Sequence, residues 1–179
     1  KTEDPTPKMV KLRKFSAYQN LERPYTRISK FTNKNFVRGG FPHMKITKFE
    51  VGDAKKRFDN TLTLHVTRSM NLRQNALEAA RMTCSRLLEK KAGKDFYFKM
   101  RVYPFHVLRE NPLAAGAGAD RMSQGMSQAY GKPVGSAARV REGQIIFELR
   151  IDKTHLNTGK EALHRASKKL PCTCKIMVQ

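Results

Sequence analysis

The residues most suggestive of chemistry surround two closely spaced glycines, Gly116 and Gly118, near the middle of the chain. Such glycines can let a backbone cradle a phosphate, as in nucleotide-binding loops. This pair lacks the Lys-Ser/Thr of a Walker loop and the third glycine of a dinucleotide fingerprint, and no helical pattern follows it. The sequence therefore disfavours a nucleotide site.

Other reactive side chains lack the neighbours that catalysis requires. Glu110 and Asp120 lie close in sequence to Arg109 and Arg121, whose charges balance theirs, whereas acid–base catalysis needs sheltered carboxylates. The chain contains no Gly-x-Ser-x-Gly or His-Glu-x-x-His segment, and no cysteine beside an obvious histidine base. We therefore predict no catalytic residue, no cofactor and no enzymatic activity.

The three cysteines do not have the spacing of metal ligands. Cys172 and Cys174 fall on one face of a predicted strand and Cys84 falls in a predicted helix, so all three are interpreted as small core residues. We predict no metal site and a reduced, cytosolic compartment.

The balance of charge identifies the class of partner. Against 15 Asp and Glu stand 36 Lys and Arg, which gives a net charge of +21. A folded chain this basic normally binds a polyanion, and nucleic acid is the first candidate. An acidic membrane surface is the second; no hydrophobic run has the length of a membrane span, and both predicted helices use their apolar stripes on a core.

Residues 1–42 are predicted to form a basic N-terminal arm. Planar and cationic side chains alternate along it, a composition that suits RNA because arginine binds phosphate and aromatic rings stack on bases. Residues 1–20 fit a solvated tail equally well. The arm residues expected to contact RNA are Arg23, Tyr25, Arg27, Lys30, Lys34 and Arg38.

The remaining residues, 43–179, are predicted to form one α+β domain. Alternating apolar residues indicate strands at 43–51, 62–66, 96–102, 145–151 and 172–178, with a further short strand possible at 137–141. Capping boxes predict helices that begin at Asn71 and Thr158. Two strand–helix–strand units in series predict a two-layer sandwich, a mainly antiparallel sheet with both helices on one face.

A stretch from about residue 104 to 135 interrupts this pattern. It contains five of the 11 glycines and little apolar surface that a core could bury. Loops of this length without secondary structure are usually functional or disordered. We therefore predict a long Gly/Ala-rich loop that is the working part of the protein.

Five segments of the chain resemble a known family. They are RPYTR (23–27), RQNALEAAR (73–81), FKMRVYPFHVLRENPLAAGAGADR (98–121), GMSQAYGKPVGSAARV (125–140) and ALHRASKKLP (162–171). In these segments the chain resembles the universal L-sixteen family of large-subunit ribosomal proteins, in the archaeal and eukaryotic form called L-ten-e.

The resemblance implies a structural protein of α/β-hammerhead fold that supports translation in the cytoplasmic ribosome. Its implied partners are large-subunit rRNA, tRNA in the A- and P-site region and neighbouring ribosomal proteins, with no membrane. Beyond the arm, the residues expected to bind rRNA are Arg57, Arg68, Arg73, Arg81, Arg101, Lys132, Arg139 and Arg141. Those expected in a loop that points toward the peptidyl-transferase centre are Phe105, His106, Arg109, Gly116, Gly118, Asp120 and Arg121. The alternative is another RNA-binding or RNA-modifying protein.

Overall fold

The structure, a computed structural model, describes residues 13–21, 23–111, 125–126 and 129–179. The strands are β1 (Glu50–Gly52), β2 (Asn60–Val66), β3 (Met70–Arg73), β4 (Phe96–Met100), β5 (His106–Glu110), β6 (Lys132–Val140), β7 (Ile145–Ile151) and β8 (Cys174–Val178). The helices are α1 (Gln74–Ala92) and α2 (Leu156–Ser167), with short 3-10 turns η1 (Phe15–Tyr18), η2 (Thr32–Lys34) and η4 (Lys153–His155).

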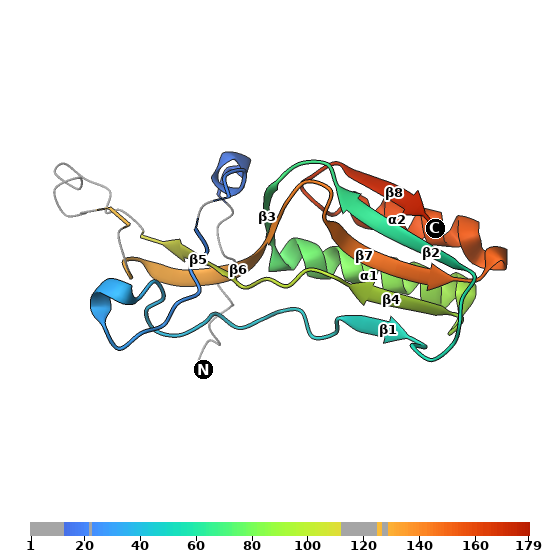
Figure 1. Cartoon of the computed structure of the whole chain (residues 1–179), viewed down its shortest axis with the longest axis horizontal. Coiled ribbons are helices and arrows are strands. Elements are labelled where there is room, and N and C mark those ends of the chain that lie inside the picture. Colours follow the sequence, from blue (N-terminus) through green and yellow to red (C-terminus); the bar gives the residue numbers. More distant parts are fainter. Residues whose placement is uncertain (1–12, 22, 112–124, 127–128) are drawn as a thin grey trace, which may run out of the picture.

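The strands form two antiparallel sheets. The larger has the order β1-β4-β7-β2-β8, and both helices cover one of its faces (Figure 1). The smaller has the order β3-β6-β5. The predicted α+β class, the antiparallel pairing and the placement of both helices are thus confirmed, while the second sheet was not predicted.

The small sheet continues the three central strands of the large one. The chain passes from β2 into β3, from β4 into β5 and from β6 into β7, and the order β4-β7-β2 in one sheet becomes β5-β6-β3 in the other. Figure 1 shows the result, an elongated molecule in which β5 and β6 extend away from the helices. In the small sheet β3 and β6 contact α1, and the N-terminal segment lies beside the sheet.

The core lies between the large sheet and the helices. Leu77, Ala80, Cys84 and Leu88 form the buried stripe of α1, at the spacing of one helical face. The rings of Phe98 and Phe147 meet on adjacent strands at 5.1 Å between centroids. The core is therefore built by strands and helices whose patterns were visible in the sequence.

Close approach of backbone requires glycine at two positions. In α2, a Cβ on Gly159 would lie 3.2 Å from Cδ2 of Leu149, so the missing side chain lets the helix lie directly on the sheet. Gly52 has a φ of 99°, and a Cβ there would collide with the carbonyl of Phe96. Of the strand predicted at 43–51, only Glu50 and Val51 are paired, in β1, which continues to Gly52.

Both helices begin elsewhere than predicted. Asn71 lies in β3, where its side-chain amide donates to the carbonyl of Asn20 at 3.0 Å. Gln74 does not close a capping box, because its side chain accepts from the Lys45 N–H at 3.0 Å and donates to the His43 carbonyl. α2 begins at Leu156, without a side-chain cap. The polar residues interpreted as caps in α1 therefore hold the N-terminal segment.

The expected loop from residue 104 to 135 is shorter than predicted. β5 occupies 106–110 and β6 begins at Lys132, so the two strands that pair across the small sheet replace both ends of the loop. Residues 112–124 and 127–128 lie outside the described residues.

In the part of the chain that the structure describes, no helix is long and apolar enough to cross a bilayer. The described His, Cys, Asp and Glu residues form no group of three with the geometry of a metal site.

Candidate nucleic-acid interface

The ion pairs between described residues gather at one end of the molecule. Among the described residues, all ion pairs but one join residues of the large sheet, the helices or the segments next to them. Lys56, for example, bridges Asp95 and Asp152 at 2.9 Å to each, and these contacts raise its pKa. The exception joins Arg13 to Glu110 of β5 at 3.0 Å.

The N-terminal arm carries the excess charge. Between Arg23 and Phe49 the chain has seven Lys and Arg and no Asp or Glu. The exposed cations here include Arg23, Arg27, Lys30, Lys34 and Arg38, all five of which were predicted to contact RNA. The arm lies along the small sheet and then along the molecule toward β1 (Figure 1).

Exposed aromatic rings gather at the same end. Within the described residues, the exposed aromatic side chains are Phe15, Phe31, Phe41, Tyr103, Phe105 and Tyr130. All of them lie in the N-terminal segment or in and around the small sheet, outside the helix-covered core. Rings that protein does not cover, placed among cations, are the elements that bind single-stranded RNA.

Tyr25 anchors the arm to β5. Its N–H donates to Nδ1 of His106 at 3.1 Å, and its carbonyl accepts from the Val107 N–H at 3.2 Å. Its ring stacks on the imidazole, with centroids 5.4 Å apart, and the Arg109 guanidinium lies 4.0 Å from the ring centroid. These contacts hold the arm against the sheet.

Arg109 is engaged inside the protein. It is only 8% exposed, and its Nη atoms donate to the carbonyls of Tyr130 and Met126 at 3.1 and 3.3 Å. The guanidinium thus links the arm, β5 and the segment before β6. The buried His106 likewise stacks on Tyr25, and the expected RNA contacts of both residues stay predictions.

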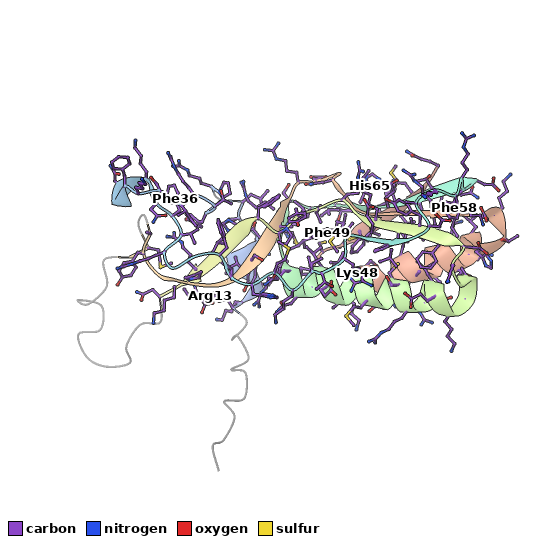
Figure 2. The ribbon with its side chains drawn as sticks, turned by 90° about the horizontal axis from the view of Figure 1, so that it is seen from below. Arg13, Phe36, Lys48, Phe49, Phe58 and His65 are labelled. Atoms are coloured by element: carbon purple, nitrogen blue, oxygen red, sulfur yellow. The ribbon has the colours of Figure 1, made fainter. Side chains whose placement is uncertain are left out.

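The outer part of the arm folds back on itself around η2. The N–H groups of Phe36 and Val37 both donate to the carbonyl of Arg27. The guanidinium of Arg23 lies 4.8 Å from the Phe36 ring centroid, and this ring meets Tyr25 at 5.9 Å. Figure 2 shows Phe36 and Phe58 at opposite ends of the molecule, so the folded arm marks the end away from the helices.

Three of the predicted arginines lie where the chain crosses between the sheets. Arg68 follows β2, Arg101 follows β4 and Arg141 follows β6, and all three are exposed. Nε of Arg101 lies 3.6 Å from Glu148, whose carboxylate also binds Arg150 at 2.8 Å. The crossings therefore carry basic groups at the ends of three strands, β2, β4 and β6.

The other predicted cations differ in their surroundings. Arg57 and Lys132 are exposed, whereas Arg73, Arg81 and Arg139 are half-buried. Arg81 is bound by the carboxylate of Glu78, which raises its pKa. The Arg73 guanidinium lies 5.8 Å from the Tyr18 ring centroid. Of the expected loop residues, Phe105, His106 and Arg109 are described, and Gly116, Gly118, Asp120 and Arg121 lie outside the described residues.

Neither Phe49 nor Tyr103 was predicted as a site residue. Their rings stack with centroids 4.3 Å apart, beside the exposed Phe105. Tyr103 and Phe105 were visible as alternate aromatic residues around Pro104. Phe49 was interpreted as part of a strand, and no sequence signal joined it to the other two.

An α+β scaffold with a basic arm, whose stretch from Arg23 to Phe49 lacks carboxylates, and with exposed rings at the same end is typical of RNA-binding proteins. The comparisons with known proteins agree with this class. The family model of ribosomal protein L16p/L10e matches residues 22–177. The chain belongs to this family.

Several relatives carry the name large ribosomal subunit protein uL16. The relative from Picrophilus torridus is 48% identical over 159 residues, which cover 87% of this chain and 90% of that protein. The one from Hyperthermus butylicus is 46% identical over 83% of this chain and 82% of its own length. The one from Archaeoglobus fulgidus is 42% identical over 90% of each.

Proposed function

We propose that this protein is a structural constituent of the large ribosomal subunit and binds large-subunit rRNA through the arm and the small sheet. Membership of a ribosomal protein family supports the assignment. The binding surface is inferred from one observation. The stretch from Arg23 to Phe49, which contains no Asp or Glu, lies at the same end of the molecule as the exposed aromatic rings. As a member of a structural ribosomal family, the protein is not an enzyme.

The charge distribution explains why RNA is required. The stretch from Arg23 to Phe49, with seven cations and no carboxylate, repels itself, and a phosphate backbone neutralises it with release of counterions. The helix-covered end is held together by its buried apolar cluster, and its ion pairs partly offset the positive charge there. The stretch from Arg23 to Phe49 has no such compensation, so it depends on RNA for neutralisation.

The finer assignment concerns tRNA. We infer that the segment between β5 and β6 supports tRNA positioning near the peptidyl-transferase centre, because the family resemblance covers this segment and its flanking strands, β5 and β6, extend away from the helices. The α/β-hammerhead type and the division into an arm, 1–42, and a domain, 43–179, rest on the same resemblance. Neighbouring ribosomal proteins are the remaining proposed partners.

The binding surface is tested by the salt dependence of affinity. The full chain should bind transcribed large-subunit rRNA of one of the relatives with a steep slope of log affinity against log salt. About 0.7–0.9 of slope is expected for each phosphate contacted. A slope near zero would exclude a binding mode based on phosphate neutralisation and overturn the proposed surface.

A further inference from the structure

Three aromatic rings form a continuous stack where the chain crosses from β4 to β5. The centroids of Phe49 and Tyr103 lie 4.3 Å apart with planes 8° from parallel, and those of Tyr103 and Phe105 lie 4.6 Å apart with planes 23° from parallel. Exposure rises along the stack, to 43% for Tyr103 and 65% for Phe105. Phe105 therefore presents an aromatic surface to a further flat group.

The stack borders a cavity of about 430 Å³. The cavity is lined by Pro24, Thr26, Tyr103, Phe105, His106 and Arg139. The lining has one permanent cation and no carboxylate. A site with aromatic walls and a guanidinium at its side favours a planar group that carries hydrogen-bond acceptors.

Arg139 supplies a donor that the described protein does not use. Its Nε is buried, and within the described residues this atom has no hydrogen-bond partner. A ligand reaches this atom only if the half-buried guanidinium turns toward the cavity that it lines. An unpaired buried donor costs free energy, so a ligand that brings an acceptor favours this turn and is preferred over a purely apolar one. This argues against an apolar side chain of another protein as the occupant.

We propose that this cavity binds one unpaired nucleobase of large-subunit rRNA. The base stacks on Phe105 and so extends the three-ring stack, while the Arg139 guanidinium donates to acceptors on the edge of the base. The pairing of guanidinium groups with N7 and O6 makes guanine the best match. The inference rests on the proposed rRNA binding and adds a defined nucleotide site to it.

Photo-crosslinking tests the site in the unaltered protein. The full chain is bound to the same transcribed rRNA and irradiated with ultraviolet light, and the peptides are then analysed by mass spectrometry. A nucleotide adduct on Tyr103 or Phe105 is expected. Adducts on arm peptides without any on the peptide that contains Tyr103 and Phe105 would overturn the proposal.

Substitution of Phe105 tests whether the contact is stacking. Phe105→Ala should weaken binding roughly 5- to 150-fold, the change that corresponds to about 1–3 kcal/mol for one stacked base. Phe105→Leu should lose nearly as much, because it keeps apolar bulk without a π face, and Phe105→Tyr should bind like the wild type. Wild-type affinity in the Leu variant would indicate a simple apolar contact and refute base stacking.

The matched control is Met82→Ala, which removes an exposed apolar side chain from α1, and it should leave binding unchanged.

Arg139→Gln should weaken binding but leave the slope of log affinity against log salt unchanged, because a base edge carries no counterion. A slope reduced by about 0.7–0.9 would show a phosphate contact instead and overturn the assignment of Arg139.

Different results would contradict the proposed rRNA binding and the proposed nucleobase site. If the wild type shows no salt-dependent binding to rRNA, the proposed function fails before Phe105 is tested. If the wild type binds as expected and Phe105→Ala binds equally well, only the nucleobase site is wrong.

Discussion

A hydrogen bond from the Tyr25 N–H to Nδ1 of His106 helps to tie the arm to the small sheet. Because Nδ1 of His106 accepts from a backbone N–H, the proton of the neutral ring is on Nε2. The adjacent bond, from Val107 N–H to the Tyr25 carbonyl, depends on backbone alone. A substitution at His106 can therefore remove one half of the anchor.

We predict that His106→Phe loosens the arm locally. The substitution keeps a ring against Tyr25 but removes the acceptor, and a net hydrogen bond of about 0.5–1.5 kcal/mol corresponds to roughly 2- to 12-fold faster opening. Amide hydrogen exchange at Tyr25 should accelerate by this factor. His106→Asn, whose side-chain oxygen can replace Nδ1, should restore slow exchange. Equal exchange in the wild type and His106→Phe would show that the bond does not hold the arm.

The three cysteines should differ in reactivity. Burial raises the pKa of Cys84 to about 12, whereas a hydrogen bond from Cys174 lowers the pKa of Cys172. The thiolate is the nucleophile, so more of Cys172 is reactive at pH 8. We expect iodoacetamide to modify Cys172 first and Cys84 last, as measured by peptide mass spectrometry. In denaturant the difference should vanish; alkylation of Cys84 as fast as Cys172 in the folded protein would contradict the assignment.

For single residues, the sequence predicted which cations are exposed better than it predicted which groups each side chain contacts. The exposed cations of the arm follow from composition, because isolated charges stay in water. Arg109 and His106 were expected to lie near the peptidyl-transferase centre, which stays a prediction, and the structure adds that both are buried against Tyr25. Sequence gave no sign of this, because the contact joins residues about 80 positions apart and depends on how the arm folds back.

Among the elements, those of the large sheet were the most predictable. β7 has the bounds predicted, and β2 and β4 contain most of the predicted alternation, because one face of each packs under helices. β3 was assigned to the start of a helix, since Leu72 fits the stripe of α1 equally well. β6 was missed over most of its length because Gly135, Ser136 and the alanines beside them show no clear period.

The ends of β5 and β6 define the segment between them that a linker can replace without removing a strand. The strand ends at Glu110 and β6 begins at Lys132, and the core cluster of the described residues includes nothing between them. We predict that a Gly-Ser linker of equal length in place of residues 112–124 changes the free energy of unfolding by less than about 1 kcal/mol. Replacement of 106–110 should cost more than about 2 kcal/mol, because it removes buried Val107 and the pairing of β5.

The same variant tests tRNA positioning. We expect the linker at 112–124 to leave incorporation into large subunits intact and to lower peptide synthesis by those subunits. The measurement pairs quantification of the variant in purified subunits with a translation assay. The control is a Gly-Ser linker in place of residues 53–55, which are exposed in the turn between β1 and β2 and outside the proposed rRNA contacts, and it should leave both readouts unchanged. Normal incorporation with wild-type synthesis in the 112–124 variant would refute the role of this segment.

For the molecule as a whole, the separation of charge should orient it on RNA. Its cations differ in whether carboxylates lie beside them. Several at the helical end form ion pairs with Glu50, Asp95, Asp152 and Glu161, while the stretch from Arg23 to Phe49 contains no carboxylate. Net charge alone would attract RNA to every face. An oriented interface requires that equal changes of charge at the two ends have unequal effects.

We therefore predict that charge reversal in the arm weakens rRNA binding much more than the same reversal beyond α2. Arg27→Glu with Arg38→Glu, both at exposed positions, should remove two phosphate contacts and lower the salt slope by about 1.4–1.8. Lys168→Glu with Lys169→Glu, also exposed, changes the net charge by the same amount and should leave the slope nearly unchanged. Affinities for the transcribed rRNA are measured over a range of salt, after circular dichroism has shown both variants folded. Equal losses in the two variants would mean that total charge, not the arm, determines binding, and the oriented interface would be wrong.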